Sequence, residues 1–206
     1  VVSFSAVTCG MLDEIGEINA IKGLAEPQYI RIPYLKEGVE KGTIADLGLA
    51  SNPNIEKIML LEPEAIFINP MEGDHVGSLQ KLNFPLIPCL DFKEALPLGQ
   101  TEWIRLMGLL FGKEELADSL FTATCERYNL LRSLTEKTDH APCAFTELKT
   151  GDFWYMPGGE SYIAHLLKDA GADYLWKDDK HSGTIHFSFE QVLDKAEHCE
   201  YWLFKR

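Results

Sequence analysis

Apolar residues recur along this chain in two ways, at a period near 3.6 that favours helices and in short continuous runs that favour buried strands. The longest helical pattern lies near the middle, from Pro97 to Lys137. A dense apolar block covers 103–111, Gly112 interrupts it, and a polar–apolar pattern with helical spacing follows. A helix over 114–137 would be roughly 36 Å long at about 1.5 Å per residue. We therefore predict a rigid helical brace that joins two α/β lobes.

Before the brace, short apolar runs alternate with short helical patterns. Residues 1–4 read as a buried strand, and Ser5 suits the N-cap of a helix that reaches Ile15. From 24 to 49 the pattern is irregular and predicts loop or short strands. This alternation is typical of an α/β lobe.

A second helix and two further strands are predicted in the same lobe. Asn52-Pro53 should begin the helix, since proline is favoured in the first turn. A buried strand over 65–68 follows it. The apolar run over 84–90 contains two prolines, so we expect it near the edge of a sheet.

After the brace the alternation resumes. Ser188 and Gln191 fit a capping box, in which Ser is the cap and Gln stands three residues later. The predicted elements are a strand over 142–148, a turn-rich aromatic segment over 150–159, a helix over 160–170, a helix over 188–196 and a buried strand over 200–204.

The two halves resemble each other. Residues 54–68 and 188–204 each read as a capped helix followed by a buried strand. We therefore predict two lobes and a connector, with boundaries at 1–96, 97–140 and 141–206.

Composition and charge exclude several classes of function. The chain has 32 acidic and 19 basic residues and a net charge of −13. This balance opposes binding to nucleic acid or to anionic lipid, which both need clustered Lys and Arg. The sequence contains no apolar run long enough to span a membrane, and it begins with a strand pattern instead of a signal peptide.

Reactive side chains form no recognisable catalytic or metal motif. The five cysteines are spread without a CxxC pair, and their odd number argues against a complete disulfide framework, so we expect most of them to be buried free thiols. The six histidines lack tight metal-ligand spacing, and neither a GxSxG elbow nor a phosphate-binding loop occurs. We therefore predict a protein that is not an enzyme and that builds no metal site of its own.

Several stretches, in this order, resemble the solute-binding proteins of iron-siderophore, haem and vitamin B12 ABC importers. The opening strand and helix, the segment Asn54-Ile-Glu-Lys-Ile-Met-Leu-Leu-Glu-Pro-Glu-Ala-Ile-Phe67, the long midpiece and 188–204 carry the resemblance. Each stretch alone is degenerate, and together they span nearly the whole chain. Members of that family usually continue for several tens of residues beyond the strand matched by 201–204, so we expect the second lobe to be truncated at Arg206.

The resemblance implies two Rossmann-like lobes joined by a long helix, with a ligand held in a cleft between them. The expected ligand is chelated iron, as a siderophore or haem, or a corrinoid, with no covalently bound cofactor. The expected partner is the permease of an ABC importer, the expected state a monomer, and the expected location periplasmic or membrane-anchored outside the cytoplasm. Two alternatives stay open, a two-lobe enzyme with an interlobe active site and a binding protein for a free metal ion.

The resemblance implies that loops at the strand ends hold the ligand, which agrees with the rule that open α/β sheets bind ligands beyond the carboxyl ends of their strands. Aromatic faces suit a large flat ligand, Arg31 suits a carboxylate or catecholate, and three adjacent aromatics at 153–155 cannot all face one core. The candidates are Ser5, Tyr29, Arg31, Tyr34 and Asn69 in the first lobe and Trp154, Tyr155, Ser161 and Tyr162 in the second, with Gly158-Gly159 as flexible neighbours.

The resemblance also implies an acidic docking point for the permease on each lobe. Glu72 and then Asp74 are the candidates on the first lobe, because they follow the strand over 65–68. The equivalent position on the second lobe would follow the strand over 201–204.

Overall fold

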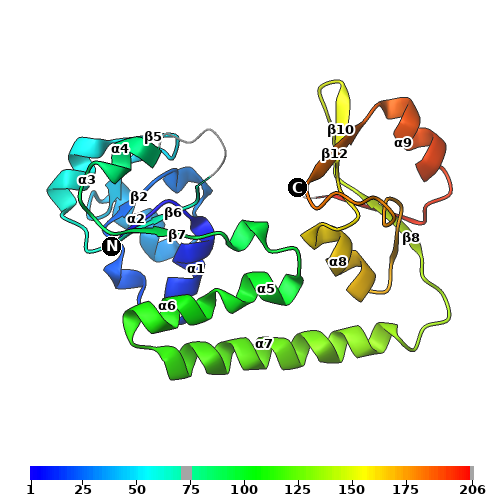
Figure 1. The fold of residues 1–206 in the computed structure, drawn as a ribbon, viewed down its shortest axis with the longest axis horizontal. Coiled ribbons are helices and arrows are strands. Elements are labelled where there is room, and N and C mark those ends of the chain that lie inside the picture. The colour runs from blue at the N-terminus through cyan, green and yellow to red at the C-terminus, as the bar shows by residue number, and fades with distance from the viewer. Residues whose placement is uncertain (71–75, 205–206) are drawn as a thin grey trace. The chain divides into compact units, whose positions relative to one another are not determined.

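A computed structural model of the protein describes residues 1–70 and 76–204 (Figure 1). The chain forms two compact units. Unit 1 comprises 1–92 and 103–119, and unit 2 comprises 93–102 and 120–206. The residues predicted as a separate connector, 97–140, are thus shared between the two units.

Unit 1 is built on a five-stranded parallel sheet in the order β3-β2-β1-β6-β7. The predicted buried strand over 65–68 is confirmed as β6, and the run with two prolines is confirmed as an edge strand of the described sheet, β7. The strands are β1 (Val2–Ser3), β2 (Gly23–Leu24), β3 (Ala45–Asp46), β6 (Ile66–Ile68) and β7 (Leu86–Pro88), and a separate antiparallel pair is formed by β4 (Gly48–Leu49) and β5 (Asn52–Pro53).

Helices connect these strands. Ser5 caps α1 as predicted, because its Oγ accepts a hydrogen bond from the Thr8 N–H at 3.2 Å. The helices and 3₁₀ turns are α1 (Ala6–Glu14), η1 (Ile18–Ala20), η2 (Pro27–Tyr29), α2 (Pro33–Glu40), α3 (Ile55–Leu61), α4 (Val76–Gln80), η3 (Asp91–Lys93) and α6 (Ile104–Phe111). One buried hydrophobic cluster of unit 1 consists of Val2, Leu47, Ile58, Ile66, Ile68 and Leu79.

Two local predictions in unit 1 were wrong. The irregular stretch over 24–49 contains a helix, α2, which begins at Pro33 in the N1 position. The next helix is not begun by Asn52-Pro53, which form β5; Asn54 is its cap and accepts from the Lys57 N–H at 2.9 Å. Proline suits both a first helical turn and an edge strand, and pairing with β4 decided between them.

The predicted brace is confirmed as one continuous helix, α7 (Glu114–Thr135), which belongs to unit 1 up to Ser119 and to unit 2 from Leu120. In unit 1 it follows α6 after a short turn, where Lys113 pairs with Glu17 at 3.3 Å. In unit 2 the Tyr128 hydroxyl donates to Asp169 Oδ2 at 2.7 Å. In unit 1 an ion pair holds the turn before α7, and in unit 2 a hydrogen bond joins α7 to the end of α8 (Tyr162–Asp169).

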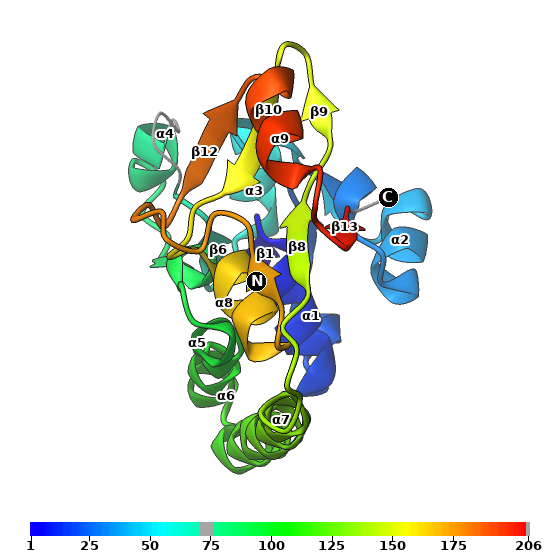
Figure 2. The ribbon, with the colours of Figure 1, turned by 90° about the vertical axis from the view of Figure 1, so that its right-hand side faces the viewer.

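Unit 2 contains two three-stranded sheets. The parallel sheet has the order β11-β8-β13, and the antiparallel sheet has the order β12-β10-β9. Figure 2 shows β10 and β12 side by side. The elements are α5 (Pro97–Glu102), β8 (Cys143–Thr146), β9 (Lys149–Thr150), β10 (Phe153–Pro157), α8 (Tyr162–Asp169), β11 (Asp173–Tyr174), β12 (Thr184–Phe187), α9 (Phe189–Ala196) and β13 (Tyr201–Leu203).

The capping box of α9 is confirmed, and three other features of unit 2 differ from the predictions. The aromatic stretch over 150–159 is mostly strand, because β10 pairs on both sides. The strand β13 is not buried: its three side chains are 44–54% exposed. Two cysteines are joined as a disulfide, Cys143–Cys199, while Cys9 and Cys89 are buried free thiols as expected.

Candidate functional site

The carboxyl ends of three neighbouring parallel strands bring together the first-lobe candidates. Strand β1 lies between β2 and β6, and all three run in the same direction. The segments that follow these strands therefore leave the sheet at one edge, which is where open α/β sheets bind ligands. Ser5 follows β1, the 29–34 segment follows β2, and Asn69 follows β6. The topology thus places all the unit 1 candidates in segments that follow the carboxyl ends of these strands.

Ser5 forms hydrogen bonds within the chain, at the start of α1, through its polar atoms. It is 5% exposed, its Oγ caps α1, and its carbonyl accepts from the Ser3 hydroxyl at 3.0 Å. The fold therefore accounts for its polar atoms, and a ligand would meet the start of the helix and not a free hydroxyl.

The 29–34 segment carries the accessible aromatic and cationic groups of unit 1. Tyr29 is 68% and Tyr34 48% exposed, and Arg31 between them is also exposed. Arg31 makes no ion pair with any residue that the structure describes. An exposed guanidinium in the same segment as two exposed phenol rings can bind a carboxylate or catecholate, and the rings can stack on a flat ligand.

Asn69 presents an unpaired acceptor. Its Oδ1 is buried and has no hydrogen-bond partner among the residues that the structure describes. A buried acceptor without a donor costs about 1–3 kcal/mol, so this amide favours an incoming N–H or O–H group. The docking candidates Glu72 and Asp74 lie close by in the chain, but they fall within 71–75, outside the described residues.

A buried acid that the sequence analysis did not identify, Asp91, begins the 3₁₀ turn η3 shortly after the neighbouring strand β7. Asp91 follows β7 and is 4% exposed, and its burial raises the pKa of the carboxyl. Burial also raises the pKa of the Cys89 thiol, and that of Cys9 to about 11. Both thiols are therefore protonated at neutral pH. The available signal was the position of Asp91 directly after an apolar strand.

The aromatic strand β10 separates its side chains by alternation, as predicted. Phe153 is 45% and Tyr155 47% exposed, whereas Trp154 is 6% exposed. The Trp154 indole donates to the Thr146 carbonyl at 3.3 Å, and its ring lies 6.1 Å from that of Phe145. The structure therefore favours core packing for Trp154 and leaves Tyr155 as the accessible candidate.

His186 completes the exposed face of this sheet. It lies opposite Tyr155 in the β10–β12 register, and its ring meets the edge of Phe153 at 5.6 Å. An exposed surface of two aromatic rings and an imidazole can stack on a flat ligand. The sequence reasoning missed His186 because it placed no strand at 184–187.

The two remaining candidates begin α8. Ser161 is 7% exposed and caps the helix, accepting from the Ala164 N–H at 3.2 Å, and Tyr162 is half-buried beside it. The preceding glycines are explained by packing: a Cβ on Gly159 would lie 2.4 Å from the Asp179 carbonyl oxygen, and one on Gly158 would lie 2.1 Å from that of His181. The turn thus needs glycine for close backbone approach, and not for flexibility beside a ligand.

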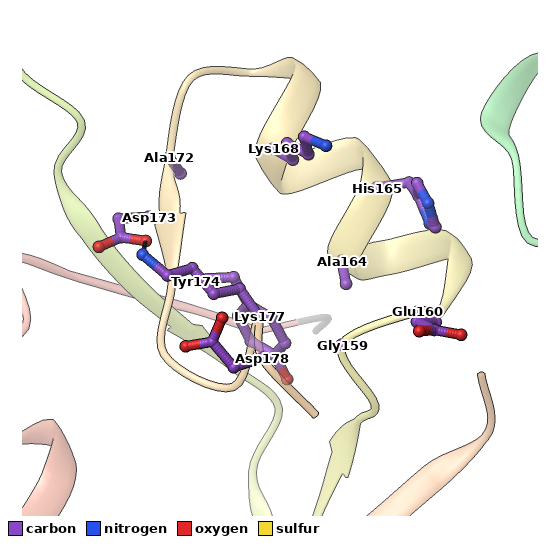
Figure 3. A pocket seen from close by; sticks show the side chains of 10 residues that line it. All are labelled: Gly159, Glu160, Ala164, His165, Lys168, Ala172, Asp173, Tyr174, Lys177 and Asp178. Carbon is purple, nitrogen blue, oxygen red and sulfur yellow. Dashed lines mark hydrogen bonds and ion pairs between the residues drawn. The ribbon is translucent and has the colours of Figure 1, made fainter. Parts of the chain in front are cut away.

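A cavity of about 390 Å³ lies between α8 and the segment after β11 (Figure 3). Asp173 and Lys177 pair with each other on one side, while Glu160, His165 and Lys168 belong to the α8 side. Within 1–70 and 76–204, no group of three or more His, Cys, Asp or Glu side chains could hold a metal ion. The cavity is therefore charged but is not a metal centre of the described residues.

Comparison with known families decides how this architecture is classified. The model of the periplasmic binding protein family matches residues 1–205, nearly the whole chain. This chain belongs to the periplasmic binding protein family.

Two curated proteins are similar to this chain in sequence. An uncharacterised lipoprotein of Methanocaldococcus jannaschii is 24% identical over 98% of this chain and 51% of its own length. The chain thus spans about half the length of the curated relatives it matches. None of the described helices is both long enough and apolar enough to cross a membrane.

Solved periplasmic binding proteins share the fold. The haem-binding protein of Vibrio cholerae aligns with a TM-score of 0.77 and 12% identity over 98% of this chain and 74% of that one. A siderophore-binding protein of Vibrio cholerae, solved with Fe³⁺–Desferal, aligns with a TM-score of 0.74 and 19% identity over 98% and 76%. At these identities the likeness establishes the two-lobe α/β architecture with its long helix, and the ligand is a separate question.

Proposed function

We propose that this chain is the ligand-capturing part of an extracytoplasmic solute-binding protein that delivers chelated iron, as a siderophore or haem, or a corrinoid to an ABC importer. The observation that carries the proposal is the match of the periplasmic binding protein family to residues 1–205. Such a protein binds and releases its solute without chemical change, so we propose no catalytic residues.

The exposed groups of each unit support a flat, partly anionic ligand. In unit 1, Tyr29, Arg31 and Tyr34 offer two exposed phenols and an exposed guanidinium. In unit 2, Tyr155 offers an accessible ring, and Trp154 supports its strand from the core. Aromatic and guanidinium groups of this kind recognise catecholates, porphyrins and corrins by stacking and charge-assisted hydrogen bonds.

The remaining candidates, Ser5, Ser161, Asn69 and Tyr162, would contact the ligand through a helix N-terminus, an amide oxygen or an aromatic ring. Ser5 and Ser161 each cap a helix, so they would present helix N-terminal N–H groups to an acidic part of the ligand. Asn69 offers its unpaired Oδ1 and Tyr162 a half-buried ring. The interlobe cleft itself stays a prediction of the resemblance.

Two observations favour a location outside the cytoplasm. One curated relative is named a lipoprotein, and Cys143 and Cys199 form a disulfide. Disulfides persist mainly in oxidising compartments. Glu72 and Asp74 remain the proposed docking residues for the permease.

The experiment is an absorbance titration of the purified protein with haemin, cobalamin, a ferric hydroxamate, a ferric catecholate and free Fe³⁺. We expect saturable binding of one chelate class and none of free Fe³⁺. Arg31→Gln should weaken binding of an anionic chelate about 10-fold or more, since a hydrogen bond to a charged group contributes about 1.5–3 kcal/mol. Tyr155→Ala should weaken it about 3- to 10-fold through lost stacking.

Leu60→Ala is the matched control. Leu60 is 85% exposed and lies near the end of α3, the helix that leads into the amino end of β6, whereas the candidates follow the carboxyl ends of the strands. Its substitution should leave the titration unchanged. Failure of all four chelates to bind would contradict the proposed ligand class, and binding of free Fe³⁺ alone would support the free-metal alternative.

A further inference from the structure

The charged cavity between α8 and the segment after β11, called the α8 cavity below, has the dimensions of a ligand site (Figure 3). Its volume of about 390 Å³ falls within the roughly 300–1,000 Å³ of ordinary ligand pockets. Small residues belong to its lining, namely Gly159, Ala164 and Ala172, and they leave space where larger side chains would fill it. Charged side chains complete the lining, so their positions decide what the cavity can bind.

One end of the α8 cavity is acidic. Glu160 directly precedes the N-cap of α8. A Cβ on the neighbouring Gly159 would lie 2.4–2.6 Å from three carbonyl oxygens of the 176–179 segment, so this segment runs beside Gly159 and places Asp178 near Glu160 (Figure 3). Glu160 has a distant partner, Lys180 at 3.9 Å, and Asp178 forms no ion pair with a described residue. Both carboxylates can therefore accept from a ligand cation.

The other end of the α8 cavity is basic. Lys168 lies in the last turn of α8, four residues after Ala164 and thus on the same face of the helix. The Gly171 N–H donates to the Lys168 carbonyl at 2.9 Å, and the chain turns here towards Ala172 and β11. Lys168 forms no ion pair with any residue that the structure describes. Its ammonium can therefore bind a ligand anion.

The other ionisable groups of the lining already have partners. Lys177 and Asp173 pair with each other, so their charges offset. His165 Nδ1 donates to the Ser161 carbonyl at 2.9 Å, which holds the imidazole against its own helix. The charges left for a ligand are two carboxylates at one end of the cavity and one ammonium at the other.

We propose that the α8 cavity binds an extended zwitterion, an ω-amino acid whose ammonium faces Glu160 and Asp178 and whose carboxylate faces Lys168. From its N-cap to Lys168, α8 rises roughly 10 Å at about 1.5 Å per residue. A chain of several methylenes separates the two ligand charges along this axis, whereas the adjacent charges of an α-amino acid reach one end at a time. The inference goes beyond the proposed function, since no proposed chelate contact lines this cavity.

Solvent exposure sets the strength expected of this site. Glu160, Lys168 and Asp178 are all exposed, so each ion pair with the ligand is weak and screened by salt. We therefore expect a Kd of about 0.1–10 mM that rises with salt concentration. Selectivity for a ligand that carries both charges is thus a sharper mark of the site than its affinity.

The test is a ¹H–¹⁵N NMR titration of the protein with 5-aminopentanoate. Pentanoate and pentylammonium are the matched ligands, because each keeps the chain and one of the two charges. We expect saturable shifts of amides in α8 and 173–178, with those of β6 in unit 1 unchanged. Each single-charge ligand, and L-alanine, should bind at least about 3-fold more weakly than 5-aminopentanoate, the scale of one exposed ion pair. Equal binding of any of these ligands, or no saturable shift with 5-aminopentanoate, would overturn the proposal.

Variants at exposed positions assign the two ends without disturbing the fold. Lys168→Met should weaken binding of 5-aminopentanoate about 2- to 5-fold and leave pentylammonium unchanged. The double variant Glu160→Gln, Asp178→Asn should weaken 5-aminopentanoate and leave pentanoate unchanged. Lys195→Met removes an exposed lysine in the last turn of α9 and is the control. If Lys195→Met weakens binding as much as Lys168→Met, net charge and not the cavity holds the ligand, and the proposal is wrong.

Discussion

Two helix–strand segments of this protein begin alike and end differently. In unit 1, α3 is capped by Asn54 and leads to β6; in unit 2, α9 is capped by Ser188 and leads to β13. Both strands are apolar and parallel to their neighbours. Yet β6 is 0–5% exposed between β1 and β7, whereas β13, which has one neighbour among the described strands, is 44–54% exposed.

The comparison separates two sources of strand stability. A strand with neighbours on both sides gains from burial, and its side chains decide its stability. A strand with one described neighbour gains less from burial, so its hydrogen bonds, its disulfide and the packing of Trp202 on Phe145 contribute a larger share of its stability. The apolar side chains of β6 therefore contribute more to the free energy of unfolding than those of β13.

The largest effect should come from shortening a side chain in β6. Ile66→Ala should destabilise unit 1 by about 2–5 kcal/mol, because Ile66 is 0% exposed and its removal leaves a cavity. The matched change Leu203→Ala in β13 should cost about 1 kcal/mol or less. Hydrogen exchange of each strand measures the two effects separately, and equal losses would contradict the distinction between the strands.

Removing the caps should have a smaller and more equal effect. Asn54→Ala and Ser188→Ala each remove a side-chain acceptor for a helix N–H and should destabilise α3 and α9 by about 1 kcal/mol. Ser182→Ala, at an exposed loop serine, is the control. Hydrogen exchange in the first turns of both helices checks this, and a much larger loss in α9 would show that the two segments differ before their strands begin.

The smallest effects concern pH, and the two units should respond in opposite directions. Burial raises the pKa of Asp91 in unit 1, so its folded form holds the proton more tightly than the unfolded chain. Stability is then lost as pH rises from the unfolded pKa, about 3.9, through the folded pKa. Asp91→Asn should remove this loss.

In unit 2, the hydrogen bond with His140 lowers the pKa of Glu200. Its contribution is present above the unfolded pKa and is lost as pH falls through the folded pKa. Glu200→Gln should flatten that acid-side slope. Urea midpoints measured from pH 3 to pH 7 for both variants test the signs, and parallel slopes would contradict them.

The sequence predicted well what depends on residues close together in the chain. The Ser5 cap, the capping box of Ser188 and Gln191, and the long helix from 114 were predicted because a cap or a helical turn involves residues three or four apart. The order of these elements also sufficed to predict the family, which the match over 1–205 confirmed.

Only the tertiary structure decided which side chains are buried and which distant residues meet. Alternation predicted that 153–155 would split between two faces, but pairing with β12 and packing on Phe145 placed Trp154 inside and Tyr155 outside. The burial of Asp91 and the pairing of Cys143 with Cys199 likewise depend on elements far apart in the sequence. Burial is the sum of contacts made by the whole fold, so no local pattern of residues contains it.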